Sequence, residues 1–245
     1  MNDQDRSRGI QNREVRVTLL GGFSVVVDSR AVTLPFSTQR VLVALALRPQ
    51  DRSVLLATLY PDGRRSQGSA SLRSALWRAR RATGHGLVEA QGQRLRLAAS
   101  VDVDLRTWTR HARSLAFEPR IDADTASSEL IEWLSRELLP AWGEEWLVLE
   151  RQRWDNLRLH TLELLTEALT AAGRHLDALE AGLAAVAIEP YRETAHRALI
   201  KAYIAEGNCA SAVAQYHQYR RLLARELGVR PTAHLQALVQ GLTDR

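Results

Sequence analysis

The 245-residue sequence holds one cysteine and one lysine and has no apolar run longer than seven residues. The lone Cys209 cannot form an internal disulfide, which excludes a disulfide-stabilised secreted domain and fits a reducing compartment. The longest apolar run, VLVALAL at 41–47, is far shorter than the roughly 20 residues of a transmembrane helix. Residues 1–14 mix both signs of charge without an apolar segment, which predicts a disordered tail and no signal peptide. These absences together predict a cytoplasmic protein that does not enter a membrane.

The motifs of the common enzyme classes are missing as well. Residues 63–69 have the Gly-x4-Gly spacing of a phosphate-binding loop, but Ser69 stands where lysine is required and no apolar strand precedes it. The scattered histidines form neither a His-Glu-x-x-His motif nor a zinc site with a second cysteine. His175 and His196 fall at predicted helix starts, where packing or hydrogen bonding is expected, and Glu144 is expected on an acidic helical face. The sequence therefore predicts a protein that is not an enzyme and needs no metal or cofactor.

Positive charge is concentrated in the first part of the chain. Residues 1–100 carry 16 basic and 7 acidic side chains, whereas residues 101–245 carry 17 basic and 21 acidic ones. A basic part joined to a mildly acidic part predicts a module that binds a polyanion, followed by a second module with another task.

Residues 15–100 predict a winged helix-turn-helix domain, because short strands surround three helices and a hairpin ends the series. Residues rich in valine, leucine and threonine predict strands at 15–20, 23–27 and 31–34. Helical patterns follow from Ser37 or Thr38, at 53–60 and at 67–82. A turn at 91–92 predicts the hairpin, which would form the wing.

The third predicted helix has one apolar face and one basic face. Its apolar stripe is Leu72, Ala75, Leu76 and Ala79. The opposite face is expected to contact DNA and holds Gln67, Arg73, Ser74, Trp77, Arg78 and Arg81. Arg80 is expected to turn toward the apolar side. The stretch SLRSALWRARRATG contains no acid that could pair with its arginines, and the guanidinium fork suits phosphate oxygens and the guanine edge. Arg94 is expected to contact DNA from the wing.

The second part of the chain predicts helices only. They are expected at 104–117, 127–138, 145–172, 174–188, 192–206, 209–226 and 231–241. Gly173 and Gly207 are 34 residues apart, as are Ala178 and Ala212. This spacing is the period of tetratricopeptide helix pairs, which form interaction surfaces. The expected fold class is thus an α+β winged helix followed by an all-α, tetratricopeptide-like repeat domain, with the boundary between residues 100 and 101.

Several stretches resemble the Streptomyces antibiotic regulatory protein (SARP) family. VRVTLLGGFSVVVDSRAVTLPFSTQRVLVALAL is similar to the start of its OmpR-type DNA-binding domain, and TLYPD at 58–62 resembles the Leu-Trp-Pro end of its second helix. SLRSALWRAR resembles its recognition helix and GQRLRL its wing, with Gln93 in place of a tyrosine. RELGVRPT at 225–232 resembles its bacterial transcriptional activation domain. The resemblance extends over about residues 15–241. Larger members of the family append a nucleotide-binding ATPase module, and because the given sequence ends before one, the chain is expected to resemble the small members.

The resemblance implies a transcriptional activator. Its partners would be double-stranded promoter DNA, bound at direct repeats as a homodimer or tandem pair, and RNA polymerase holoenzyme through its sigma and core subunits. Contact with the polymerase is expected at loop 61–69, with Arg64 and Arg65, and at the helical domain. The expected targets are promoters of secondary-metabolite gene clusters.

Two alternatives remain open from the sequence. The helical repeat domain could bind a partner or effector as a regulated interaction module, or DNA binding could repress transcription.

Overall fold

A computed structural model describes residues 14–61, 65–84, 86–118 and 123–243, and it divides into two compact units. The first unit contains the chain up to Thr107 together with Leu138–Trp146, and the second contains Trp108–Glu137 and the chain from Leu147 onward. The predicted tail at 1–14 lies outside the described residues except for Glu14. The structure thus groups the chain differently from the predicted division at residue 100.

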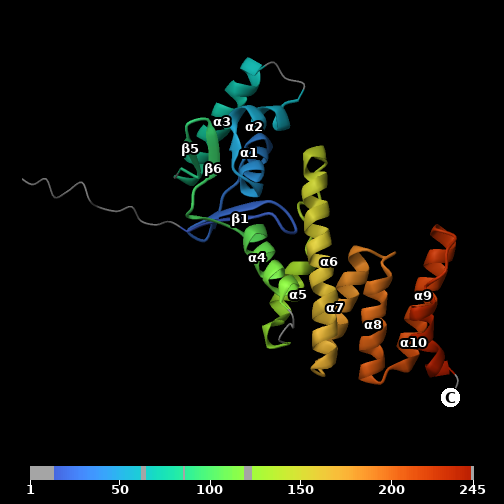
Figure 1. Cartoon of the computed structure of the whole chain (residues 1–245). Coiled ribbons are helices and arrows are strands. Elements are labelled where there is room, and N and C mark those ends of the chain that lie inside the picture. The colour runs from blue at the N-terminus through green and yellow to red at the C-terminus, as the bar shows by residue number, and fades with distance from the viewer. Residues whose placement is uncertain (1–13, 62–64, 85, 119–122, 244–245) are drawn as a thin grey trace, which may run out of the picture. The chain divides into compact units, whose positions relative to one another are not determined.

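The first unit begins with a four-stranded sheet of order β3-β2-β1-β7. Figure 1 labels its strand β1. Its strands are β1 (Val15–Thr18), β2 (Ser24–Val27), β3 (Arg30–Ala31) and β7 (Val101–Val103). Val15 and Val17 are buried while Arg16 is exposed, as a half-buried strand requires. The parallel pairing of β7 with β1 was not predicted, because a three-residue Val-Asp-Val strand gives almost no local signal.

Three helices and a second sheet complete the predicted winged helix. The helices are α1 (Phe36–Leu47), α2 (Arg52–Leu59) and α3 (Arg65–Thr83). The second sheet, of order β4-β6-β5, consists of β4 (Gln50–Asp51), β5 (Val88–Gln91) and β6 (Arg94–Leu97). Helix α1 begins one residue after Pro35, whose fixed φ suits a helix start, so Ser37 and Thr38 lie inside the helix and do not cap it.

Residues 138–146, which we call the strap, return from the helical part of the chain to the first unit. The backbone of Leu139 donates to Leu19 O at 3.0 Å, and Leu138 forms an isolated antiparallel bridge with Leu20. For this reason the helix predicted at 127–138 ends earlier, as α5 (Ser128–Ser135). The strap also holds Glu144, which pairs with Arg40 of α1 and does not form part of an acidic helical face.

The second unit is helical in its described residues. It contains α5 and the part of α4 (Asp104–Phe117) from Trp108 onward. The later helices are α6 (Val148–Ala171), α7 (His175–Ile188), α8 (Glu193–Glu206), α9 (Cys209–Glu226) and α10 (Ala233–Thr243). A short 3-10 turn lies at Ala123–Thr125, and another, at Glu145–Leu147, precedes α6. Gly173 and Gly207 take φ of +74° and +87° at the turns of the predicted repeat, a conformation that favours glycine.

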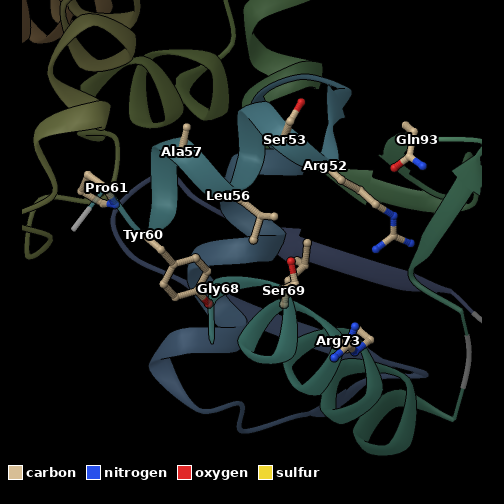
Figure 2. A pocket seen from close by; sticks show the side chains of 11 residues that line it. Arg52, Ser53, Leu56, Ala57, Tyr60, Pro61, Gly68, Ser69, Arg73 and Gln93 are labelled. Carbon is tan, nitrogen blue, oxygen red and sulfur yellow. The ribbon is translucent and has the colours of Figure 1, made fainter. Parts of the chain in front are cut away.

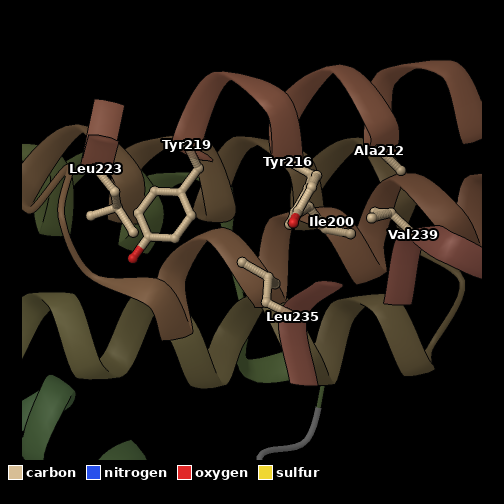
Figure 3. Close-up of a cluster of buried hydrophobic side chains, with 7 residues drawn as sticks. All are labelled: Ile200, Ala212, Tyr216, Tyr219, Leu223, Leu235 and Val239. Carbon is tan, nitrogen blue, oxygen red and sulfur yellow. The ribbon is translucent and has the colours of Figure 1, made fainter. Parts of the chain in front are cut away.

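Small residues bring the paired helices close together. Ala178 and Ala212 are fully buried, and Gly182 of α7 packs against Leu199 of α8 so closely that an added Cβ would lie 3.1 Å from Leu199 Cδ1. Farther along the chain, α8, α9 and α10 share an apolar cluster that includes Ile200, Tyr219 and Leu235 (Figure 3). The predicted fold class, a winged helix followed by stacked helix pairs, is confirmed.

Within the described residues, no helix combines the length and apolar character needed to cross a membrane. The same residues bring together no group of three His, Cys, Asp or Glu side chains that could hold a metal ion.

Candidate nucleic-acid interface

Helix α3 is held in the first unit by one narrow apolar face. Leu72, Ala75 and Ala79 are buried, while Leu76 at the edge of the stripe is half-buried. The contacts of this face with α1 and α2 fix the rotation of α3, so the remaining faces point to solvent.

Most of the predicted DNA-contacting residues lie on that solvent-facing surface. The side chains of Gln67, Arg73, Ser74, Trp77 and Arg81 are exposed. Among the described residues, no acidic side chain pairs with Arg73 or Arg81, and α3 has no acid in its first turn. Like charges therefore gather on one side of α3 without internal compensation, which suits an anionic ligand.

Trp77 is 58% exposed, unusually open for a large aromatic side chain. The Arg81 guanidinium lies over its ring, with Cζ 5.2 Å from the ring centroid. This exposed cation–π contact is worth about 0.5–1 kcal/mol and favours the arginine beside the indole. The two side chains thus lie together on the surface of α3.

Arg78 and Arg80 do not lie where the sequence placed them. Arg78 is half-buried, and its Nη2 donates a long hydrogen bond of 3.4 Å to Ser37 Oγ on α1. Its buried Nε has no partner among the described residues. Arg80, expected to turn toward the apolar side, is exposed, because it lies beyond Leu76 at the edge of the buried stripe.

The hairpin of β5 and β6 presents one unpaired arginine. Arg94 at the start of β6 is exposed and forms no ion pair with the described residues. Arg96 points to the same solvent side but pairs with Glu89 on β5 at 2.7 Å. Arg94 is thus the better placed of the two to bind an external anion.

A pocket of about 500 Å³ lies between α2, α3 and the hairpin turn. Its lining includes the cationic side chain of Arg52, which the sequence did not predict as a DNA-contacting residue. Figure 2 shows Arg52, Arg73 and Gln93 at one end of the pocket and Tyr60 at the other. The backbone of Arg52 donates to Gln93 O at 2.9 Å, which joins the start of α2 to the hairpin. No local pattern marks Arg52, because its place in the same pocket as Arg73 depends on how the helices pack.

Polymerase contact was predicted at Arg64 and Arg65. Arg64 lies outside the described residues, and Arg65 is the first residue of α3, of which only the backbone is described.

The charged groups buried in the second unit serve its packing. Arg192 binds both carboxylate oxygens of Glu163, at 2.7 and 2.9 Å, and this pairing raises the pKa of Arg192. Arg158 is almost fully buried, where it pairs with Asp155 and donates to the carbonyls of Leu134 and Ser135. These side chains have protein partners and offer no free site.

Comparison with known proteins places the chain in a family. Residues 103–243 match the model of the bacterial transcriptional activator domain. The regulatory protein AfsR of Streptomyces coelicolor is 29% identical over 240 residues, and AfsR of Streptomyces griseus is 27% identical over 237. Each alignment covers 92% of this chain but only 24% of the relative, so the chain spans about a quarter of the length of the AfsR proteins.

Two mycobacterial proteins are also similar. The transcriptional regulatory protein MoaR1 of Mycobacterium bovis is 36% identical over 84 residues, which are 34% of this chain and 26% of MoaR1. The structure of Mycobacterium tuberculosis EmbR, solved in complex with a low-affinity phosphopeptide, has a TM-score of 0.70. It is 20% identical and covers 93% of this chain and 64% of EmbR, so it supports the fold alone. Because the activator-domain model matches more than half of the residues, the chain belongs to the bacterial transcriptional activator domain family, within the SARP-type group that its sequence resembles.

Proposed function

We propose that the chain is a sequence-specific DNA-binding regulator that activates transcription. In this proposal α3 enters the major groove, and the hairpin of β5 and β6 contacts the neighbouring minor groove or backbone. The observation that carries it is the solvent-facing surface of α3, where arginines without acidic partners surround an exposed tryptophan.

The geometry suggests a role for each side chain. Arg73 and Arg81 are free to bind guanine edges or phosphates, and Ser74 and Gln67 can bond bases or phosphates. Trp77 would pack against sugars or a thymine methyl group. Arg94 would act from the hairpin.

Arg78 and Arg52 fit contacts with the DNA backbone better than base recognition. Arg78 reaches a base edge only by leaving Ser37, so we assign it to a phosphate near the start of α1. Arg52, which lines the same pocket as Arg73, would bind a second phosphate.

Family membership supports the remaining part of the proposal. We infer that a homodimer or tandem pair binds direct repeats near promoters of secondary-metabolite genes in the cytoplasm. RNA polymerase holoenzyme would be recruited through the α2–α3 connection, with Arg64 and Arg65, and through the helical unit.

The first test is a binding titration with DNA fragments that the full chain selects from a random pool. Arg73→Ala and Arg81→Ala should each weaken binding by about 1–3 kcal/mol if the arginine reads a guanine. If the arginine instead contacts a phosphate, the dependence of log K on log salt concentration should become shallower, with its slope reduced in magnitude by about 0.9. Arg30→Ala removes an exposed arginine from β3 and serves as the matched control. Unchanged binding in both α3 variants would remove this helix from the interface.

A promoter-linked transcription assay then decides the sign of regulation. Activation is expected from the full chain, and repression would contradict that part of the proposal. If residues 101–245 alone retained the activity, the chain would act as an interaction module and not through DNA.

A further inference from the structure

The strap is fixed to the first unit by its aromatic side chain as well as by its backbone. Trp142 is buried, and its ring lies 4.8 Å from the ring of Phe36 and 6.0 Å from that of Phe23, measured between centroids. Together with the backbone bond from Leu139 to Leu19, these contacts hold the strap against the connection between β1 and β2 and against the start of α1. The position of Glu144, two residues after Trp142, is thereby defined.

Glu144 holds Arg40 of α1. Its Oε2 accepts from Arg40 Nη2 at 2.9 Å, and the indole N–H of Trp146 donates to the same oxygen. Both charged side chains are largely shielded, with exposures of 17% for Glu144 and 21% for Arg40. A charge pair that is shielded from water in this way is stronger than one on the surface.

Arg40 in turn contacts the end of α2. Its Cζ lies 5.8 Å from the centroid of the Tyr60 ring, and Tyr60 is the residue that ends α2. Arg40 Nε is buried without a partner among the described residues, so the arginine depends on Glu144 and Tyr60 to stay in place. Without Glu144, solvent would be the better environment for this guanidinium.

Tyr60 contacts the first turn of α3. Figure 2 shows the Tyr60 ring beside Gly68, and a Cβ built on Gly68 would lie 3.7 Å from Tyr60 Cδ2 and 3.4 Å from Leu56 Cδ2. The ring therefore occupies the space against which the start of α3 rests. Contacts thus run without a gap from Glu144 through Arg40 and Tyr60 to the helix that carries the exposed arginines.

We propose that the strap positions the recognition helix. Glu144 orients Arg40, Arg40 orients Tyr60, and Tyr60 determines where the first turns of α3 lie. A segment that follows α5 in the chain thereby sets the geometry of the DNA-binding surface. The inference rests on the proposed function only for the role of α3, because the packing itself does not depend on DNA.

The test uses the full chain and measures amide hydrogen exchange at residues 67–72 without DNA. Glu144→Gln should speed exchange there by about tenfold, which is the effect of losing a charged hydrogen bond on a local opening equilibrium. Glu145→Gln makes the same change at an exposed neighbour and should leave exchange unchanged. Tyr60→Ala should reproduce the effect of Glu144→Gln, while Tyr60→Phe, which keeps the ring, should behave as the parent chain.

A double variant separates positioning from simple destabilisation. If Glu144 acts through Tyr60, Glu144→Gln combined with Tyr60→Ala should speed exchange no more than either change alone. Additive effects, or equal exchange in Glu144→Gln and Glu145→Gln, would overturn the proposal. The second readout is affinity for a selected duplex, which should fall by about five- to tenfold in Glu144→Gln. If the parent chain does not bind any duplex, the proposed function fails, and the exchange data still decide whether the strap positions α3.

Discussion

His196 of α8 occupies a buried site with a partner for each ring nitrogen. Its Nε2 lies 2.9 Å from Pro190 O and its Nδ1 lies 3.0 Å from Gln215 Nε2, and the ring stacks on Tyr219 with centroids 4.0 Å apart. A carbonyl only accepts, so Nε2 carries the proton and Nδ1 accepts from the Gln215 amide. The sequence predicted hydrogen bonding or packing at this helix start, and the structure contains both.

Burial lowers the pKa of His196 below its usual value of about 6.5, despite the opposing effects of the Pro190 carbonyl and of Glu193. As the pH falls below 6.5, the unfolded chain takes up this proton before the folded chain does. The free energy of unfolding should therefore be highest above that pH and fall on acidification, by at most about 1.4 kcal/mol per pH unit from this residue. His196→Phe keeps a ring against Tyr219 but cannot titrate, so its stability should depend less on pH. Urea titrations at pH 5.5 and 7.5 measure this, and equal pH dependence in both proteins would exclude the assignment.

The candidate interface shows how far single residues can be predicted from sequence. Helical spacing identifies the buried residues Leu72, Ala75 and Ala79 of α3, because they follow the 3.6-residue period, but it placed Arg80 toward the apolar side, where it does not lie. It cannot show that Arg78 turns to Ser37, 41 positions earlier in the sequence, or that Arg52 lines the same pocket as Arg73. Those contacts depend on how α1, α2 and α3 pack together, which no local pattern encodes.

At the scale of elements, the crossing of α7 with its neighbours depends on one glycine. An added Cβ on Gly182 would lie 3.1 Å from Leu199 Cδ1 and 3.3 Å from Thr166 Cγ2, whereas Gly241 in α10 has nothing within 4 Å. Gly182→Ala should therefore lower the free energy of unfolding by about 1–3 kcal/mol. Gly241→Ala, the same change at an open site, should raise it by a few tenths to about 1 kcal/mol through helix propensity. Denaturant titrations compare the two, and a stabilising Gly182→Ala would show that the helices can separate without loss.

Elements with strong local signals were predicted to within a few residues. The helices α6 to α9 combine apolar periodicity with glycine or proline at their ends, so the patterns at 145–172 and 209–226 correspond to α6 and α9. Strand β7 and the strap escaped prediction because each is defined by a distant partner. β7 pairs with β1, and the strap pairs with residues next to β1.

At the scale of the whole molecule, the predicted boundary at residue 100 removes parts of the first unit. It excludes β7, the strap and Asp104, whose buried carboxylate accepts from the backbone N–H groups of Leu19, Leu20 and Leu105. Desolvation raises the pKa of Asp104 in spite of these bonds. The carboxylate therefore joins β1 to α4, and the loop after β1 depends on residues beyond 100.

A fragment of residues 14–100 should consequently be much less stable than one of residues 14–146. Buried backbone groups of Leu19 and Leu20 would lose their partners, and the aromatic contacts of Phe23 and Phe36 with Trp142 would be lost. A loss of several kcal/mol corresponds to a lower thermal midpoint by more than about 10 °C for a domain of this size. Thermal unfolding followed by circular dichroism measures the difference. Equal midpoints would show that the shorter fragment is a complete domain.

The strap also has a consequence for synthesis on the ribosome. Residues 108–137 separate two parts of the first unit, so about 40 more residues must be made after Thr107 before Trp142 and Glu144 reach their partners. At roughly 5–20 residues per second, this leaves the partly formed unit without its last segment for some seconds. The first unit, although most of it precedes the helical unit in the chain, is thus completed only when part of the helical unit has already emerged.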